Sequence, residues 1–261
     1  MIDLARSIWT HRFAMYSQFV VNIKTTVAAT KLGPLWWILD PLVLMAVYTF
    51  VIKIVFNRGG PGFHLFALCG IVTWQSFSKA LNNSARSLQS NQSLIRQTAL
   101  PMQLYVLIPP IVQSFFYLIG LTIIAIWNHD VVGWQTLAAP ALLLPMVLLP
   151  FGLGLFLSII IVHIPDLGKF LPYFLRMGFF FSPVLYAPER IYNMQGAPEI
   201  LKTLFAMNPM VHVITAVRDL LFTGKMFNMA TYLIIIGVSL ALVQFGLLFS
   251  RRYAPGIPKA L

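Results

Sequence analysis

The sequence predicts an all-α, polytopic membrane protein with six transmembrane helices. Of its 261 residues, 59% are hydrophobic and 10% are charged, whereas soluble domains are roughly 45–50% apolar and about 25% charged. The apolar residues gather in runs close to the roughly 20 residues that a helix needs to cross a bilayer. Lys and Arg are divided unequally among the segments between these runs. Together these observations indicate that lipid is the solvent for most of the chain.

Residues 1–31 form an amphipathic segment ahead of the first apolar run. Apolar residues recur at three- and four-residue spacing from Ala5 to Val27, and polar residues occupy most of the opposite side. This pattern predicts a helix that lies in the membrane interface, where its cationic side chains reach lipid headgroups. The segment lacks the continuous apolar core and cleavage site of a signal peptide.

The remaining chain divides into six predicted spans and a polar outer region. The spans cover 36–56, 64–85, 104–127, 137–162, 167–186 and 229–249. Segment 187–228 is too polar and interrupted to cross the membrane, but it contains short apolar pieces at 200–207 and 210–222. Such pieces predict re-entrant or interfacial helices. We expect one transmembrane domain, with the bundle over 32–250 and a cytoplasmic tail over 251–261.

The distribution of positive charge predicts the orientation. With the N-terminus inside, the cytoplasmic segments hold ten Lys and Arg residues and the outer segments hold five. Because Lys and Arg accumulate on cytoplasmic loops, both termini are expected in the cytoplasm. The net charge of +11 does not indicate nucleic-acid binding, because no basic run is interleaved with aromatic residues.

No catalytic or metal-binding pattern is present in the sequence. It lacks a P-loop, GxGxxG, HExxH and GxSxG, and its five histidines are scattered without metal-ligand spacing. The single cysteine, Cys69, excludes an intrachain disulfide and a cysteine-based metal site. We therefore expect a non-enzyme without cofactor or metal, driven by a partner protein or by an ion gradient.

Two kinds of residue inside the spans are candidates for function. Arg176 lies near the middle of the fifth span, where a charge is expensive, so it is expected to face a polar interior or to pair with a carboxylate. Aromatic residues at the end of that span could stack on the apolar faces of sugars, or could simply face lipid. These aromatic residues are Phe179, Phe180, Phe181 and Tyr186.

Four stretches in order carry a family resemblance. They are LGPLWW at 32–37 continuing through Asp40-Pro41-Leu42 to Tyr48; GIVTW at 70–74 followed by NQSLI at 91–95 and Leu100-Pro101; Asp166-Leu167 followed by SPVLY at 182–186; and Asn208-Pro209-Met210 followed by Arg218-Asp219. The set resembles the membrane subunit of type-2 ABC exporters that move O-antigen, capsule or teichoic-acid polymers. That family often has Arg before the Asp-Leu pair, where this chain has Pro165.

The resemblance implies a homodimer in the bacterial cytoplasmic membrane that works with two copies of a separate ATPase, to which ATP and Mg bind. It implies an undecaprenyl-linked polysaccharide as substrate, a cytoplasmic coupling segment over 87–100 and outer gate helices over 187–228. The expected ATPase contacts are Asn91, Leu94, Ile95 and Arg96. The expected attraction sites for the lipid diphosphate are Arg6, Arg12, Lys24 and Lys31. The expected gate residues are Asn208, Pro209, Arg218 and Asp219, and the expected pathway residues are Arg176 and the four aromatic residues of the fifth span.

Two other functions fit the same sequence. A type-2 ABC permease for a drug or a small lipid would share the architecture and differ in substrate. An ion-coupled secondary carrier would work without an ATPase, although central acidic residues are scarce, Asp40 being the nearest.

Overall fold

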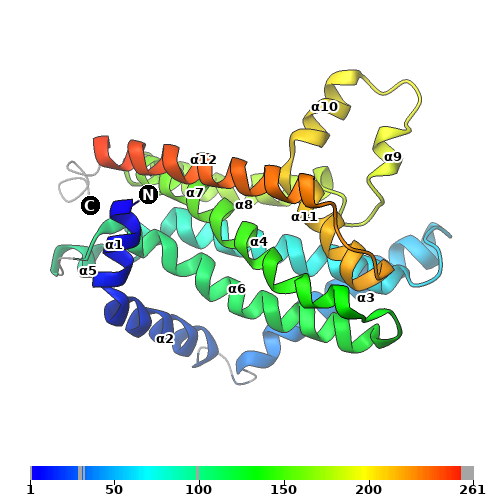
Figure 1. Cartoon of the computed structure of the whole chain (residues 1–261), viewed down its shortest axis with the longest axis horizontal. Coiled ribbons are helices and arrows are strands. Elements are labelled where there is room, and N and C mark those ends of the chain that lie inside the picture. Colours follow the sequence, from blue (N-terminus) through cyan, green and yellow to red (C-terminus); the bar gives the residue numbers. More distant parts are fainter. Residues whose placement is uncertain (1, 29–30, 32, 98–99, 254–261) are drawn as a thin grey trace.

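The computed structural model describes residues 2–28, 31, 33–97 and 100–253. Over this part of the chain the protein is helical and contains no strand, so the predicted all-α class is confirmed. The long helices run side by side along the longest axis of the molecule (Figure 1). They are α3 (Trp36–Thr49), α4 (Phe63–Ser90), α6 (Met102–Trp127), α7 (Leu143–His163), α8 (Pro165–Phe181) and α12 (Met229–Tyr253).

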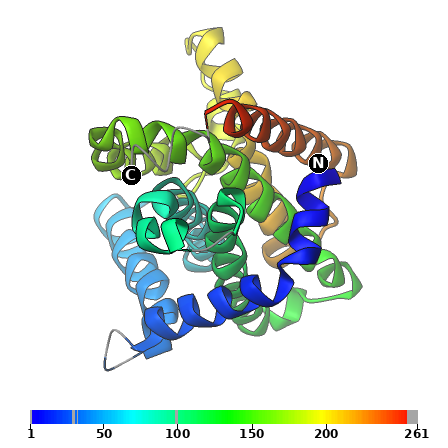
Figure 2. The same cartoon turned by 90° about the vertical axis from the view of Figure 1, so that its left-hand side faces the viewer.

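The N-terminal segment forms two helices, α1 (Ile2–Thr10) and α2 (Arg12–Ala28), where the sequence predicted one. The chain bends at His11, whose ring Nδ1 lies 3.0 Å from the Ser7 carbonyl oxygen. Helix α2 lies across one end of the bundle (Figure 2). Met15 of α2 is buried in a core cluster with residues of α6 and α7, and Phe19 packs on Ile108 of α6, so the segment is held to the bundle by apolar contacts.

Helix α4 is the centre of the bundle and contacts α3, α6, α7, α8 and α11 (Pro209–Arg218). Small residues allow this close packing, as they commonly do between membrane helices. A Cβ added to Gly154 of α7 would lie 2.5 Å from the Cβ of Ser84. A Cβ added to Gly178 of α8 would lie 2.7 Å from the ring of Trp74. These glycines therefore allow α7 and α8 to pack closely against α4.

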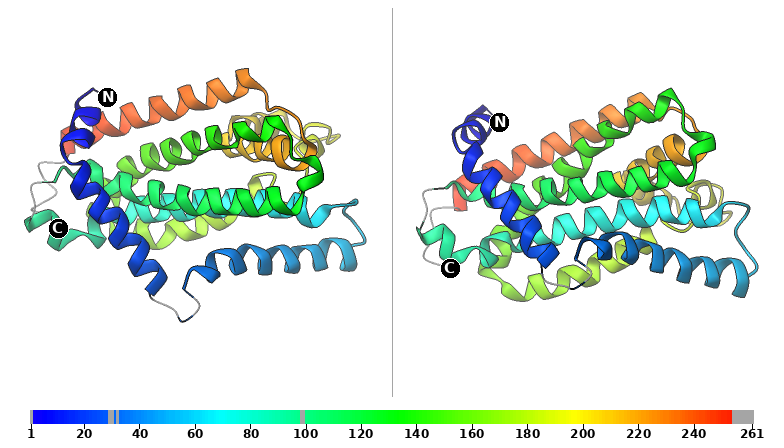
Figure 3. Two further views of the ribbon diagram at one scale, coloured as in Figure 1. Left: turned by 60° about the horizontal axis from the view of Figure 1, so that its bottom comes forward. Right: turned by 90° about the horizontal axis from the view of Figure 1, so that it is seen from below.

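Over the described residues, length and composition identify four candidate spans, or five if the bent pair Glu199–Met207 and Pro209–Thr223 is one span. The four are Trp36–Val55, Met102–Trp127, Trp134–His163 and Met229–Tyr253. The first combines α3 with the π-helix η2 (Phe50–Val55), and the third combines the 3-10 helix η4 (Trp134–Leu142) with α7. Helix α4 is long enough, with 28 residues, but it is more polar, and α8 has 17 residues. Both lie within the bundle beside the others (Figure 3). The predicted count of six is thus not confirmed by length and composition.

The outer region consists of short helices with a sharp bend. They are α9 (Glu189–Tyr192), α10 (Glu199–Met207), α11 and η5 (Asp219–Thr223). The two apolar pieces predicted there do form helices, and their axes differ by 67° across Asn208. Pro209 begins α11, and the residue before a proline disfavours helical backbone, so the bend falls where the sequence placed it.

The two ends of the bundle carry different segments (Figure 1). Helix α1, the short helix α5 (Gln92–Gln97), the α7–α8 turn and the end of α12 lie at one end. The end of η2 and helices α9 and α10 lie at the other. The 3-10 helices η1 (Gly33–Leu35) and η3 (His129–Val131) complete the connections.

Candidate functional site: a two-part groove beside the central helix

An open groove lies between α3, α4 and α8, with a volume of about 560 Å³. Helix α4 lines it with polar side chains, and α3 and α8 line it mainly with aromatic and apolar ones. Its walls are Leu44 and Tyr48 of α3, Trp74, Gln75, Ser78, Lys79, Asn82 and Asn83 of α4, and Pro172, Leu175, Arg176, Phe179 and Phe180 of α8. We call it the inner groove.

The start of α3 is joined to α4 by an ion pair next to the inner groove. Lys79 Nζ lies 2.9 Å from Asp40 Oδ2 and 5.1 Å from the ring centroid of Trp37. Trp37 in turn stacks on Phe116 of α6, with centroids 3.7 Å apart. Charges in membrane helices are expensive unless they are paired or hydrated. Asp40 and Lys79, which lie in the first and second predicted spans, are therefore partners.

Arg176 is exposed in the inner groove rather than buried in the bundle. Its guanidinium carbon lies 6.0 Å from the ring centroid of Tyr173. Among the described residues no carboxylate forms a salt bridge with it. Of the two surroundings predicted for Arg176, the structure shows the polar one, which is the open inner groove. The carboxylate partner is not found among the described residues.

The predicted aromatic residues occupy different places. Phe179 is buried and its ring centroid lies 5.4 Å from that of Tyr48, which closes α8 onto α3. Phe180 is exposed and lines the inner groove. Phe181 is exposed but lines neither the inner groove nor the second groove described below. Tyr186 donates a hydrogen bond to the Phe180 carbonyl over 3.0 Å and lines a second groove.

This second groove, which we call the outer groove, also has a volume of about 560 Å³. Phe180 lines both grooves, so they meet at this residue. Two cationic side chains, Arg58 and Arg190, stand in a wall that is otherwise aromatic and apolar. The main aromatic residues of that wall are Phe56, Phe63, Phe66, Tyr186 and Phe222. The two grooves together follow α3 and α8 toward the outer segments.

Beside the outer groove, Arg218 ties α11 to two other parts of the chain. Its side chain is 4% exposed. The guanidinium donates hydrogen bonds to the carbonyls of Val184 (2.6 Å), Tyr186 (3.3 Å) and Phe66 (3.3 Å), and lies 3.5 Å from the Phe66 ring centroid. Backbone carbonyls thus satisfy a buried charge, as they must if it is to remain in the protein interior.

Three of the four family-like stretches meet at this arginine. Asn208 Nδ2 donates to Ser182 Oγ over 2.9 Å, and Asn208 Oδ1 accepts from Met210 N over 3.0 Å, which caps α11. A Cβ added to Gly70 would lie 2.5 Å from the Val184 oxygen and 2.9 Å from Arg218 Nη2. The motifs are therefore complementary parts of one packed cluster. Asp219, the fourth predicted gate residue, lines a separate cavity of about 110 Å³ between α7, α11 and α12.

The predicted cationic residues of the N-terminal helices lie outside both grooves. Arg6, Arg12, Lys24 and Lys31 are all exposed. The Arg12 guanidinium lies 4.8 Å from the ring centroid of Trp9 and 4.7 Å from that of Phe13. This combination of cation and exposed aromatic rings is typical of a surface at the membrane interface.

The predicted coupling segment contains helix α5. Asn91 Nδ2 donates to the Ser87 carbonyl over 2.8 Å, and Ile95 N donates to the Asn91 carbonyl over 2.9 Å. Ile95 is buried in a core cluster and Leu94 packs partly against it, whereas Arg96 is exposed. The apolar pair therefore holds α5 to the bundle, and Arg96 projects from it.

Comparison with known proteins identifies the family. The family described as ABC-2 type transporter matches residues 17–222. The chain belongs to the ABC-2 type transporter family. This ABC-2 transporter is 23% identical over 245 residues to the O-antigen export system permease protein RfbA of Klebsiella pneumoniae, with 89% of each chain covered. It is 23% identical over 246 residues to RfbA of Myxococcus xanthus, with 93% of each covered.

A further relative has a different named cargo. The ABC-2 transporter is 22% identical over 214 residues to the polysialic acid transport protein KpsM of Escherichia coli, covering 79% of this chain and 80% of the relative. Family membership makes the chain a transporter permease subunit, which is not itself an enzyme. Among the described residues no group of three or more His, Cys, Asp or Glu side chains could hold a metal ion.

Sequence reasoning missed the polar wall that α4 gives to the inner groove. Gln75, Ser78, Lys79, Asn82 and Asn83 all line it. Their spacing of three, one, three and one residues places them on one face of a helix. A polar stripe at helical spacing inside a predicted span was the signal that could have found it.

Proposed function

We propose that this ABC-2 transporter exports a lipid-linked polysaccharide across the bacterial cytoplasmic membrane. The names of its relatives support a polysaccharide cargo, since they include O-antigen export and polysialic acid transport proteins. The observation that carries the proposal is the two-part groove that runs from the polar wall of α4 to the outer segments. An elongated open groove suits a polymer that moves along it better than it suits a small enclosed ligand.

The groove chemistry fits sugars. Aromatic rings offer flat apolar faces for the C–H surfaces of a sugar, and amide side chains can both donate to and accept from its hydroxyl groups. Phe180 supplies such a face where the grooves meet, and Asn82 and Asn83 supply amides in the inner groove. Asn82 Oδ1 is buried without a hydrogen-bond partner in the described structure, whereas Asn83 is exposed and can offer its amide to a substrate.

A second copy of the chain would close the grooves. Only 6% of the α3 span is buried in the chain, against 67% of the span formed by η4 and α7. The exposed faces of α3 and α8 flank the inner groove and carry large apolar residues such as Val47, Phe174 and Phe181. We propose a homodimer in which these faces meet, with α4 and α8 as the second and fifth of six spans. Polar α4 is then protected from lipid by its neighbours.

Energy would come from two copies of a separate ATPase subunit that binds ATP and Mg, because this chain carries no nucleotide-binding motif. The ATPase would dock on α5, with Arg96 and Asn91 at the contact. Both termini would lie in the cytoplasm, which places α1, α5 and the end of α12 on the ATPase side. The α10–α11 pair would form the outer gate, built on Asn208, Pro209 and Arg218.

The lipid end of the substrate would be attracted to α1 and α2. Arg6, Arg12 and Lys24 are exposed on these helices, and Lys31 follows them. Basic residues near a membrane surface each contribute about 1 kcal/mol of attraction to anionic groups. An undecaprenyl-type diphosphate in the inner leaflet would therefore concentrate beside the start of α3.

The test is a deletion strain complemented with groove variants. Asn83→Leu blocks the polar wall of the inner groove with an apolar side chain of similar size, and Asn193→Leu makes the same change at an exposed outer position. We expect surface polysaccharide, measured on immunoblots, to fall with the first variant and to persist with the second, while the ATPase co-purifies with both.

Other results would favour the rival functions. If the deletion removes drug resistance and leaves surface polysaccharide intact, the permease serves a drug or a small lipid. If no ATPase co-purifies with the full-length chain, an ion-coupled carrier replaces the proposal.

A further inference from the structure

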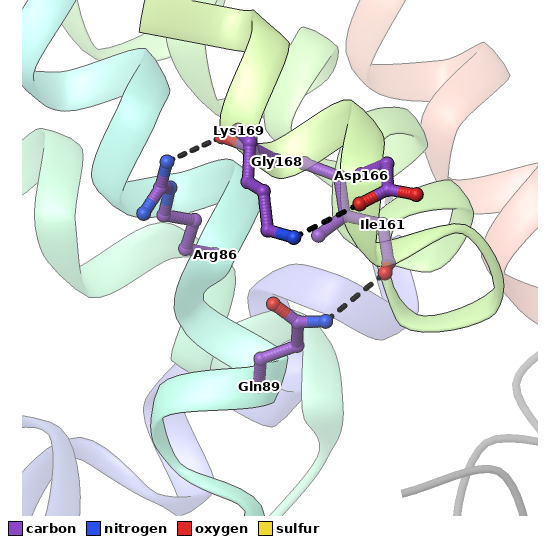
Figure 4. A network of polar contacts seen from close by, with 6 residues as sticks. All are labelled: Arg86, Gln89, Ile161, Asp166, Gly168 and Lys169. Atoms are coloured by element: carbon purple, nitrogen blue, oxygen red, sulfur yellow. Dashed lines mark hydrogen bonds and ion pairs between the residues drawn. The ribbon is translucent and has the colours of Figure 1, made fainter.

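The last turns of α4 donate side-chain hydrogen bonds to three different helices. Two of these bonds, to α7 and α8, are drawn in Figure 4. The bonds run from Ser84 Oγ to the Val106 carbonyl of α6 (2.7 Å), from Arg86 Nη2 to the Gly168 carbonyl of α8, and from Gln89 Nε2 to the Ile161 carbonyl of α7 (3.0 Å). Three residues of α4 therefore bind backbone carbonyls near the ends of its three neighbours.

The acceptors are carbonyls that their own helices leave without a partner. In an α-helix the carbonyl of residue i accepts from the N–H of residue i+4, and proline has no N–H. Pro110 stands four residues after Val106, and Pro172 stands four residues after Gly168, each inside its helix. The side chains of α4 thus supply the donors that these prolines remove, a compensation that membrane helices require.

The third carbonyl is free for a related reason. Ile161 lies in the last turn of α7, where carbonyls lack helical partners. Pro165 stands four residues later and begins α8, so the next helix offers no N–H either. Gln89 supplies the missing donor. A related bond lies away from α4, where the Tyr232 hydroxyl donates to the Ala141 carbonyl of the 3-10 helix η4 over 2.9 Å, four residues before Pro145.

The α7–α8 turn that receives two of these bonds is itself tightly built. Pro165 fixes the backbone at the first position of α8, where a proline is well tolerated. Asp166 and Lys169 form an exposed ion pair of 3.0 Å across the first turn of α8 (Figure 4). Gly168 packs on α7, because an added Cβ would lie 3.2 Å from Ile161 Cγ2. The start of α8 therefore follows any movement of this turn.

The position of the bonds along α4 matters, because α5 begins at Gln92, three residues after Gln89. We propose that Arg86 and Gln89 are positioning residues that join α5 to α8, so that the end of α4, α5 and the α7–α8 turn move as one body. A displacement of α5 then reaches Pro172, Arg176 and Phe179, which line the inner groove on α8. That a displacement begins at α5 rests on the proposed function.

The joint can be tested on the full-length chain alone in nanodiscs. Spin labels at Ser93→Cys on α5 and Phe170→Cys on α8, both exposed positions, report the distance between the two helices in a Cys69→Ala background. The labelled chain is diluted in an excess of unlabelled chain, so that distances between two copies do not contribute. We expect one narrow distance peak, loss of that peak in the double variant R86M/Q89M, and its retention in R86K, which keeps a cationic donor. A wild-type distribution as broad as that of the double variant would overturn the joint.

Export by the complex with its ATPase gives the second measurement. Coupling free energies of 1–3 kcal/mol correspond to factors of about 5–150, so R86M/Q89M should export about tenfold less polymer per ATP hydrolysed. Ser90→Ala, an exposed change on the last turn of α4, is the matched control and should export normally. Normal export by R86M/Q89M would refute the mechanical role. If instead no ATPase acts on this chain, the nanodisc distances still decide whether the joint exists.

Discussion

Replacing Arg218 with Met tests whether the outer cluster depends on its buried guanidinium. Methionine keeps much of the side-chain volume and removes every donor. The carbonyls of Val184, Tyr186 and Phe66 then lose their hydrogen bonds, and the ring contact with Phe66 is lost as well. Helix α11 would no longer be fixed to the start of α4 or to the segment after α8.

The expected effect is large for a single substitution. A hydrogen bond contributes about 1 kcal/mol net, and a hydrogen bond to a charged group about 1.5–3 kcal/mol. Two of the three bonds are long, at 3.3 Å, so we take the lower figure for these and the higher range for the 2.6 Å bond to Val184. The sum is about 3.5–5 kcal/mol, which for a chain of this size corresponds to a fall of about 10 °C in melting temperature.

Fluorescence-detected size-exclusion chromatography after heating measures that fall in detergent. The control is Arg190→Met, which removes the same charge from an exposed position in the outer groove. This control should have the same melting temperature as the wild type. If R218M melts no lower than R190M, the bonds to the three carbonyls do not hold the cluster together, and the account of the motifs around Arg218 is wrong.

Three further predictions concern Gly70, the Asp40–Lys79 pair and Arg96. Gly70→Ala should destabilise the chain by about 1–3 kcal/mol, the usual range for overpacking, because the added Cβ meets the Val184 oxygen at 2.5 Å; thermal melting measures this. Lys79→Asp should reduce polymer export, and adding Asp40→Lys should restore it by re-forming the pair, whereas a double variant as poor as the single would count against the pair. Arg96→Glu should weaken ATPase co-purification without lowering the melting temperature, because the side chain is exposed; unchanged co-purification would exclude this contact.

Local chemistry explains which parts of the fold were predictable from sequence. The bend between α10 and α11 follows from Asn208-Pro209, because a proline and the residue before it determine the backbone within a few positions. The length of the hydrophobic runs correctly predicted α3, α6, α7 and α12, each of which lies in one of the candidate spans. The amphipathic spacing predicted one N-terminal helix where two form, since nothing in that spacing marks the bend at His11.

The side-chain partners were not predictable in the same way. Asp40 and Lys79 meet only because α3 and α4 pack with these faces together, and the rotation of two helices about their axes is set by packing across the whole bundle. Arg218 binds backbone carbonyls, and every residue carries one, so the sequence offers no pattern to match. The aromatic run at 179–181 was visible, but its division into one buried and two exposed rings depends on how α8 faces α3.

The polar composition of α4 and the prolines of its neighbours are best understood as one property. Hydropathy excludes α4 from the candidate spans, although it is the helix that most others contact. Five of its polar residues between Gln75 and Asn83 line the inner groove. Three later ones, Ser84, Arg86 and Gln89, donate to carbonyls on α6, α8 and α7. A carbonyl left free in lipid costs several kcal/mol, so α6 and α8 can keep Pro110 and Pro172 only while a donor stands beside them. Donors on a central helix therefore allow prolines in its neighbours, and those prolines in turn require a central helix too polar to be recognised as a span by its hydropathy.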